Sequence, residues 1–198
     1  MKRYRKTVVI LAGGQGSRMG YRDKAFLRYG GTPFIEHLLK KVEAFAEVIV
    51  VSNNPGEYRN YPVKVVEDKV KGIGPLGGIY TGLLHSTHEE ILVISCDTPF
   101  QREEFLEYMG GLSGSYDAAI PKHREGREPL CALYRRSLLR GIEELIEEKR
   151  YKIALLFEKN RVEWVDIESM TKGIEIVKGF KNINTPEELR EVGGEYEK

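Results

Sequence analysis

Short apolar runs alternate with polar and glycine-rich segments through the first half of the chain. Four of these runs are typical of strands in a parallel sheet, which are mainly apolar because helices cover both of their faces. They comprise residues 8–10, 48–51, 62–66 and 91–95. After the first run, Thr32 and Pro33 suit a helix start, and apolar side chains from Phe34 to Phe45 follow at helical spacing. This alternation predicts an α/β fold with a Rossmann-like, mostly parallel central sheet flanked by helices and joined by right-handed crossovers.

The second half of the chain shows shorter patterns. The predicted strands cover residues 118–120, 130–134 and 162–167, and the predicted helices cover residues 103–109 and 138–146. Residues 154–157 fit either element. Thr185 and Glu188 have the spacing of a capping box, which predicts a helix start there, and the tail from Gly193 is expected to fray. We therefore expect one domain spanning residues 1–198.

The stretch from Thr7 to Leu27 indicates a binding site for phosphate groups. An apolar strand leads into glycines 13, 14, 16 and 20, which are interleaved with Arg18 and Lys24. Glycines let backbone N–H groups approach an anion closely, while the two cations can neutralise β- and γ-phosphates. Neither the P-loop spacing nor the G-x-G-x-x-G spacing is present. A simple strand-to-helix turn would explain the glycines but neither of the two cations.

Polar residues follow three of the other predicted strands. Asn53, Asp68 and Asp97 stand where these strands end, and a second glycine loop at residues 72–78 leads into another helix. Ligands of open α/β sheets bind beyond the carboxyl ends of the strands, so these residues are expected to converge on the opening loop. Asp97 is the candidate ligand for Mg²⁺, which takes one or two carboxylates and leaves its other positions to water and phosphates. Its alternative role is the N-cap of the following helix.

Composition adds further expectations. The chain has 198 residues, 41% of them hydrophobic and 31% charged, as is typical of a globular protein. A net charge of +1 gives no electrostatic reason to expect nucleic acid or membrane binding. The apolar run after the basic start is shorter than that of a signal peptide, and no run approaches the ~20 residues of a membrane span. We expect a cytoplasmic protein in which Cys96 and Cys131 are reduced thiols, with a disulfide as the alternative.

The opening motif, LAGGxGxRMGxxDK at residues 11–24, resembles that of nucleotidyltransferases, and most closely that of the molybdenum cofactor guanylyltransferases, usually called MobA. The landmarks CDTP at residues 96–99 and NINTPEEL at residues 182–189 extend the resemblance over nearly the whole chain. Tyr21 departs from the pattern, because the family commonly has a second glycine there. The resemblance implies a nucleotidyltransferase that uses Mg²⁺ and transfers GMP from GTP to molybdenum-loaded molybdopterin. Pyrophosphate and molybdopterin guanine dinucleotide would be the products.

The resemblance also assigns roles to individual residues. It implies that the backbone of Leu11, Ala12 and Gly13 contacts GTP, together with Asn53, Asp68, Lys24 and Asp97. Arg18, Lys24 and Asp97 would be the catalytic residues, and Asn182 and Asn184 would lie on the acceptor side. Simpler alternatives stay open: Asn53 as a turn residue, Lys24 as a surface lysine, and the two later asparagines as turn or capping residues. Molybdoenzyme maturation proteins are candidate partners.

Two other functions are compatible with these residues. One is a nucleotidyltransferase for another base or acceptor, which would make a nucleotide sugar or the cytosine dinucleotide of the same cofactor. The other is a noncatalytic nucleotide-sensing module. The presence of Arg18, Lys24 and Asp97 together argues against the sensing module, because nucleotide binding alone does not need a carboxylate for the metal.

Overall fold

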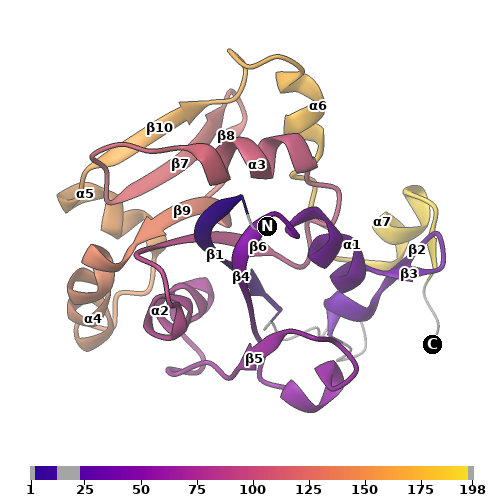
Figure 1. Ribbon diagram of the computed structural model, residues 1–198, viewed down its shortest axis with the longest axis horizontal. Helices are drawn as coiled ribbons and strands as arrows, with labels where there is room; N and C mark the ends of the chain where they lie inside the picture. Colours follow the sequence, from indigo (N-terminus) through magenta and orange to yellow (C-terminus); the bar gives the residue numbers. More distant parts are fainter. Residues whose placement is uncertain (1–2, 13–22, 196–198) are drawn as a thin grey trace.

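A mostly parallel sheet runs through the middle of the protein, as the computed structural model shows for residues 3–12 and 23–195 (Figure 1). Its strands are β1 (Tyr4–Leu11), β4 (Phe45–Val51), β5 (Lys64–Val66), β6 (Glu90–Ser95), β7 (Ala118–His123), β8 (Gly126–Arg127), β9 (Cys131–Arg135) and β10 (Val162–Asp166). The strand order is β10-β7-β9-β6-β1-β4-β5, with β8 beside β7. Only β8 and β9 pair antiparallel to their neighbours in the described part of this sheet, so the α/β prediction is confirmed.

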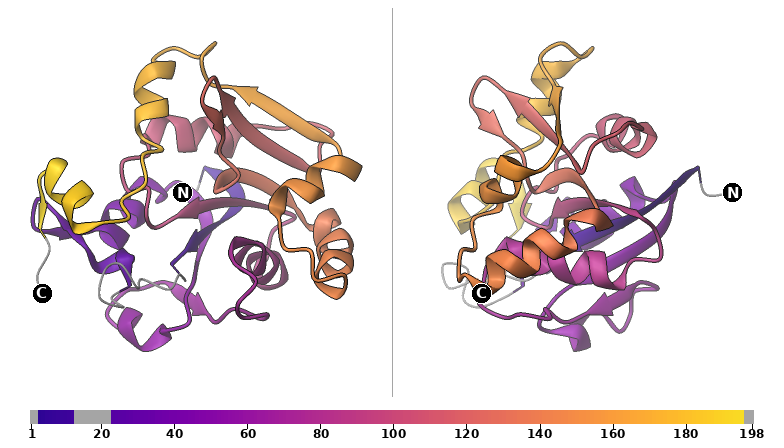
Figure 2. Two further views of the ribbon diagram at one scale, coloured as in Figure 1. Left: turned by 180° about the vertical axis from the view of Figure 1, so that it is seen from behind. Right: turned by 90° about the vertical axis from the view of Figure 1, so that its left-hand side faces the viewer.

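Helices cover both faces of the sheet (Figures 1 and 2). Helices α1 (Phe34–Lys41), α3 (Glu103–Gly111) and α6 (Gly173–Lys178) pack on one face, and α2 (Pro75–His85), α4 (Leu139–Glu147) and α5 (Leu156–Lys159) on the other. Successive side chains of a strand point to opposite faces. Accordingly, Val8 and Ile10 of β1 enter the first core, while Val9 and Leu11 enter the second. Burial of β1 on both faces explains its continuous apolar run.

The register of the central strands brings three strand ends together. Leu11, the last residue of β1, pairs with Val51 at the end of β4 and with Ser95 at the end of β6. Backbone hydrogen bonds extend this alignment by one residue on each side. The N–H of Ala12 donates to the carbonyl of Val51 at 2.9 Å, and that of Cys96 donates to the carbonyl of Leu11 at 3.0 Å. The residues that follow these strands therefore lie at one edge of the sheet.

A second, smaller sheet joins an early segment of the chain to a late one. It contains β2 (Arg28–Tyr29), β3 (Thr32–Pro33) and β11 (Gly194–Glu195), and helix α7 (Pro186–Glu191) lies beside it in Figure 1. The core beneath it is made of Leu27, Phe34, Ile183 and Leu189. The predicted capping box is present, since Thr185 Oγ1 accepts from the Glu188 N–H and the Glu188 carboxylate accepts from the Thr185 N–H.

Several predicted boundaries were wrong. Thr32 and Pro33 form a short strand, and α1 begins only at Phe34 and ends at Lys41. Phe45 starts β4, although its spacing had placed it on that helix. Gly194 and Glu195 pair with β2, whereas the tail had been expected to fray from Gly193. In the described residues, no helix is long and apolar enough to cross a membrane.

Candidate active site

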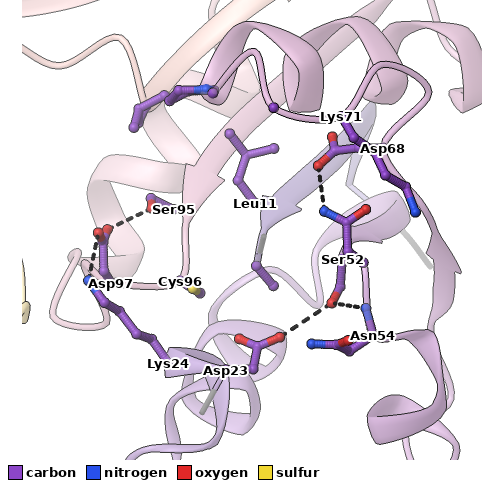
Figure 3. A pocket seen from close by; sticks show the side chains of 16 residues that line it. Leu11, Asp23, Lys24, Ser52, Asn54, Asp68, Lys71, Ser95, Cys96 and Asp97 are labelled. Carbon is purple, nitrogen blue, oxygen red and sulfur yellow. Dashed lines mark hydrogen bonds and ion pairs between the residues drawn. The ribbon is translucent and has the colours of Figure 1, made fainter. Parts of the chain in front are cut away.

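A cavity of about 840 Å³ opens at the carboxyl edge of the central strands (Figure 3). Leu11 and Ala12 reach it from β1, residues 52–54 follow β4, and residues 95–97 end and follow β6. The loop before α2 adds Asp68, Lys71 and Gly74, the last with φ +67°. Such a positive φ favours glycine, so this loop conformation requires the residue found there. The three predicted strand-end residues, Asn53, Asp68 and Asp97, all line this cavity, whereas most of the opening loop lies outside the described residues.

One side of the cavity carries an aspartate and a lysine (Figure 3). Asp97 Oδ1 accepts a 2.6 Å hydrogen bond from Ser95 Oγ, and Asp97 Oδ2 lies 3.7 Å from Lys24 Nζ. Both side chains are about one-fifth exposed, at 23% for Asp97 and 21% for Lys24. Lys24 is therefore not a free surface lysine. The N-cap position of α3 is occupied by Arg102, so the alternative role of Asp97 as that cap is wrong.

A segment near the end of the chain reaches this same pair. Lys24 Nζ donates a 2.7 Å hydrogen bond to Asn184 Oδ1, and the Ile183 N–H donates to the Asp97 carbonyl at 2.8 Å. Asn184 is held in turn, because its N–H donates to the Glu188 carboxylate at 2.6 Å. The structure thus brings Asn184 to the candidate catalytic residues. Asn182 is exposed and is not among the residues that line the cavity in the described ranges.

The opposite side of the cavity carries an amide and a carboxylate. Asn53 Nδ2 donates a 3.1 Å hydrogen bond to Asp68 Oδ2. Among residues 3–12 and 23–195, Asp68 Oδ1 has no hydrogen-bond partner. Burial raises the pKa of Asp68, while the Asn53 hydrogen bond and the Lys71 charge act in the opposite direction. In Figure 3, Leu11 lies between Asp68 on one side and Asp97 on the other.

Sequence reasoning missed a buried network beside the cavity. Asp23 is only 9% exposed, and it accepts hydrogen bonds from the Ala25 N–H at 3.0 Å, from Tyr58 at 2.7 Å and from Ser52 Oγ at 3.3 Å. Burial is the largest influence on its pKa, which is raised although each of these hydrogen bonds lowers it. The opening motif includes Asp23, but no spacing in the sequence relates it to Tyr58. Ser95, Lys71 and Leu130 also line the cavity and were missed.

The two cysteines are free and buried, as expected for reduced thiols. Cys96 lines the cavity, and burial together with the nearby charges of Asp23 and Asp97 raises its pKa. A thiol with a raised pKa is a poor nucleophile, because the thiolate is the reactive form. Cys96 is therefore a filler at the cavity wall.

Two of the predicted site residues, Gly13 and Arg18, lie outside the described residues. In the described parts of the chain, no group of three His, Cys, Asp or Glu side chains could hold a metal ion by itself. The single carboxylate of Asp97 nevertheless suits Mg²⁺, since that ion is commonly bound by one or two carboxylates together with substrate phosphates. An amine 3.7 Å away is also suited to bind the same phosphates.

Comparisons with known proteins agree with this geometry. Residues 8–162 match the family described as MobA-like NTP transferase domain. A probable molybdenum cofactor guanylyltransferase of Clostridium perfringens is 41% identical over 192 residues, covering 95% of this chain and 96% of the relative. Another from Pelotomaculum thermopropionicum is 36% identical, with coverages of 92% and 89%.

A solved structure is similar as well. The crystal structure of molybdopterin-guanine dinucleotide biosynthesis protein A from Archaeoglobus fulgidus superposes with a TM-score of 0.80 at 31% sequence identity. The match covers 94% of this chain and 96% of that one. The fold, the cavity at the ends of its central strands and the match over residues 8–162 together establish that this chain belongs to the MobA-like NTP transferase family.

Proposed function

We propose that this protein transfers GMP from GTP to molybdenum-loaded molybdopterin. The terminal phosphate oxygen of the pterin attacks the α-phosphorus of GTP in line, and the bond from that phosphorus to the bridging oxygen of the β-phosphate breaks. Pyrophosphate leaves, and molybdopterin guanine dinucleotide forms. The attacking phosphate is already an anion, so the reaction needs no strong general base.

The observation that carries this proposal is the chemistry of the two sides of one cavity. One side has an amide and a carboxylate, and the other has an amine and a carboxylate. Asp68 lies on one side together with its hydrogen-bond donor Asn53, and Lys24 and Asp97 lie on the other. Guanine presents N1–H and N2–H₂ donors, which a carboxylate such as that of Asp68 can accept. We also assign backbone contacts with GTP to Leu11 and Ala12, which line the cavity.

The phosphate side supports nucleotidyl transfer. Preorganised cations that face developing negative charge are the main catalytic resource in reactions of this kind. Lys24 is held beside Asp97 at the cavity, where it would bind the β- and γ-phosphates and stabilise the leaving pyrophosphate. We assign the same task to Arg18 and backbone contacts with GTP to Gly13.

Asp97 would hold Mg²⁺ together with the nucleotide phosphates. The bound ion would supply charge neutralisation on the phosphate oxygens. Ser95 supports this role, because its hydroxyl donates to Asp97 Oδ1 and fixes the direction of the carboxylate.

The acceptor is assigned to the Asn184 side of the cavity. Asn184 contacts Lys24, so an acceptor phosphate bound there would lie near the cation that serves the nucleotide. We keep Asn182 as a second acceptor contact. Molybdoenzyme maturation proteins as recipients of the product, and a cytoplasmic location, also stay predictions.

Pyrophosphate release tests this function. The purified protein is given Mg²⁺ and molybdenum-loaded molybdopterin, with GTP, CTP, ATP and UTP in separate reactions. We expect release with GTP alone. Release with CTP instead would identify the cytosine dinucleotide as the product. If all four fail and sugar 1-phosphates restore release, the protein makes a nucleotide sugar. Nucleotide binding with no release under any condition would indicate a sensing module.

A further inference from the structure

Asp23 has more hydrogen bonds than its own turn requires. Its Oδ1 accepts from the Ala25 N–H at 3.0 Å and so caps η2 (Lys24–Phe26), a single turn of 3-10 helix. A cap needs only one side-chain oxygen and is commonly exposed to water. The other oxygen, Oδ2, accepts 2.7 Å and 3.3 Å hydrogen bonds from Tyr58 and Ser52.

These two additional donors come from a different part of the chain. Ser52 directly follows β4, and its hydroxyl also accepts from the Asn54 N–H at 3.1 Å. Tyr58 ends η3 (Pro55–Tyr58) and is 1% exposed, so its hydroxyl is fixed in the protein interior. Asp23 therefore ties the lysine-bearing turn to the loop that carries Asn53.

A carboxylate this deeply buried is costly unless hydrogen bonds compensate for its lost hydration. Here three donors converge on it, and the ring of Tyr58 packs 4.9 Å from that of Phe26 on the lysine-bearing turn. Polar contacts and aromatic packing thus fix the same relationship between the two segments. Lys24 directly follows Asp23, so these contacts also fix the position of its backbone. Asn184 and Asp97 contact only the amine at the end of its side chain.

We propose that Asp23 is a positioning residue for Lys24, and that Tyr58 is the contact through which it acts. Together they hold the Lys24 amine at a fixed position relative to the loop that carries Asn53, which would bind the base. The triphosphate of a bound nucleotide then meets the amine without rearrangement of the turn. This inference rests on the proposed function in assigning the phosphates to Lys24.

The test replaces Tyr58 with Phe, which removes the hydroxyl and keeps the ring. Dissociation constants of GTP and GMP are measured by calorimetry with Mg²⁺ and without acceptor. We expect Tyr58→Phe to weaken GTP binding roughly fivefold or more, since groups coupled through contact typically show effects of this order. GMP lacks the β- and γ-phosphates that Lys24 contacts, so its affinity should change by less than about twofold, within the scatter of uncoupled sites.

A double-mutant cycle with Lys24→Ala tests the same coupling. In the Lys24→Ala background, Tyr58→Phe should change GTP affinity by less than about twofold, because the group that it positions is gone. Tyr61→Phe is the matched control. The Tyr61 ring lies in the same aromatic cluster, 6.1 Å from Phe26, but its hydroxyl donates to the exposed carboxylate of Glu36. This control should leave both affinities unchanged.

Three results would overturn the inference: unchanged GTP affinity in Tyr58→Phe, equal weakening of GTP and GMP, or equal effects with and without Lys24. Asp23→Asn provides a second variant with the same expectations, and melting temperatures show whether each variant is folded at the assay temperature. Because these assays contain no acceptor, a failure of the proposed function can be distinguished from a failure of this inference. It would appear as nucleotide binding with the predicted coupling but no pyrophosphate release once molybdenum-loaded molybdopterin is added.

Discussion

Asp97 combines a fixed position with an accessible carboxylate. Ser95 Oγ donates to one oxygen, Lys24 Nζ lies 3.7 Å from the other, and the Asp97 carbonyl accepts from the Ile183 N–H. The side chain makes few contacts on which the core depends, so its chemistry can be tested separately from folding. The same holds for Asn184, whose amide oxygen meets Lys24 from the far end of the chain.

Asp97→Ala should lower turnover by at least roughly a hundredfold, because it removes the candidate metal ligand and changes the electrostatic surroundings of the phosphates. The melting temperature should change little. Steady-state pyrophosphate release checks the first expectation, and calorimetry checks the second. Asp166→Ala is the control, since Asp166 is likewise a carboxylate at the end of a strand, β10, but does not line the cavity. Normal turnover in Asp97→Ala would remove this residue from the mechanism.

Asn184→Ala should lower kcat/KM for the acceptor about tenfold, in line with the loss of one hydrogen bond to a charged group. The variant removes the 2.7 Å contact that orients the Lys24 amine. Asn182→Ala is the matched comparison, because its side chain is exposed and belongs to the same segment. Kinetics with varied acceptor concentration should show the larger effect for Asn184. A larger effect for Asn182 would show that Asn182, and not Asn184, is the main acceptor contact.

At the level of elements, the close packing of α2 on β1 positions the end of β1 at the cavity. A Cβ on Gly78 would lie 2.6 Å from Leu11 Cδ2, and one on Gly82 would lie 2.8 Å from both methyl groups of Val9. The Leu11 methyl could shift, but the β-branched side chain of Val9 is stiff, so α2 can pack this near to β1 only because position 82 is a glycine. Gly82 thus positions the strand end from which Leu11 and Ala12 reach the cavity.

Gly82→Ala should destabilise the fold by roughly 1–3 kcal/mol through overpacking against Val9. Gly141→Ala in α4 is the control, because the nearest atoms to its added Cβ lie 3.9 Å away. That substitution should be neutral or stabilise the fold by up to about 1 kcal/mol, since it only reduces the freedom of the unfolded chain. Denaturant unfolding of both variants measures the difference. Equal free energies of unfolding for the two variants would mean that α2 can move away from β1 without loss of stability.

The edge strand β10 is anchored by an ion pair. Arg161 Nε donates to Asp117 Oδ2 at 3.2 Å, and hydrogen bonds from Arg161 hold the pKa of Asp117 below its usual value of 3.8, with Ser137 assisting. A lowered folded-state pKa gives stability that is present above the unfolded pKa and is lost as pH falls through the folded pKa. Asp117→Asn should therefore be less stable than the wild type at pH 7. The difference should shrink as the pH falls below about 4, the unfolded value for aspartate. Denaturant unfolding at several pH values measures it, and a difference that does not vary with pH would contradict this cause.

Elements with a strong local pattern were predicted well, and those defined by tertiary pairing were not. Buried β1 and β6 were evident from their apolar runs, and the helix at Pro186 was evident from its capping box. The two-residue strands β2, β8 and β11 are too short to carry a periodic signal, and β11 is defined by its pairing with β2, far away in the sequence. Helix α6 was missed as well.

The same distinction applies to the candidate site. Asn53, Asp68 and Asp97 could be found because they follow predicted strands, and the parallel topology brings such positions together. Tyr58 and Ser52 could not be linked to Asp23, because no local pattern encodes a contact across 29 or 35 residues. Sequence reasoning also did not distinguish Asn184, which contacts Lys24, from Asn182, which is exposed.

At the scale of the whole molecule, an early and a late segment of the chain meet at one edge of the sheet. Lys24 and Asn184 are 160 residues apart in sequence and are joined by a hydrogen bond. The small sheet strengthens this closure, since β11 near the end of the chain pairs with β2 just after Lys24. The candidate nucleotide side of the cavity is built from the β1–β6 half of the fold, and the segment after α6 completes the candidate acceptor side. Under the proposed function, this arrangement would bring a nucleotide and an acceptor to the same amine.

The most direct test of guanylyl transfer follows the α-phosphorus itself. The protein is incubated with Mg²⁺, molybdenum-loaded molybdopterin and GTP that is radiolabelled at the α-phosphate, and the products are separated. We predict that the label appears in molybdopterin guanine dinucleotide, with one pyrophosphate released for each dinucleotide formed. Label that remains in GTP, or that appears only as free GMP, would contradict guanylyl transfer to this acceptor.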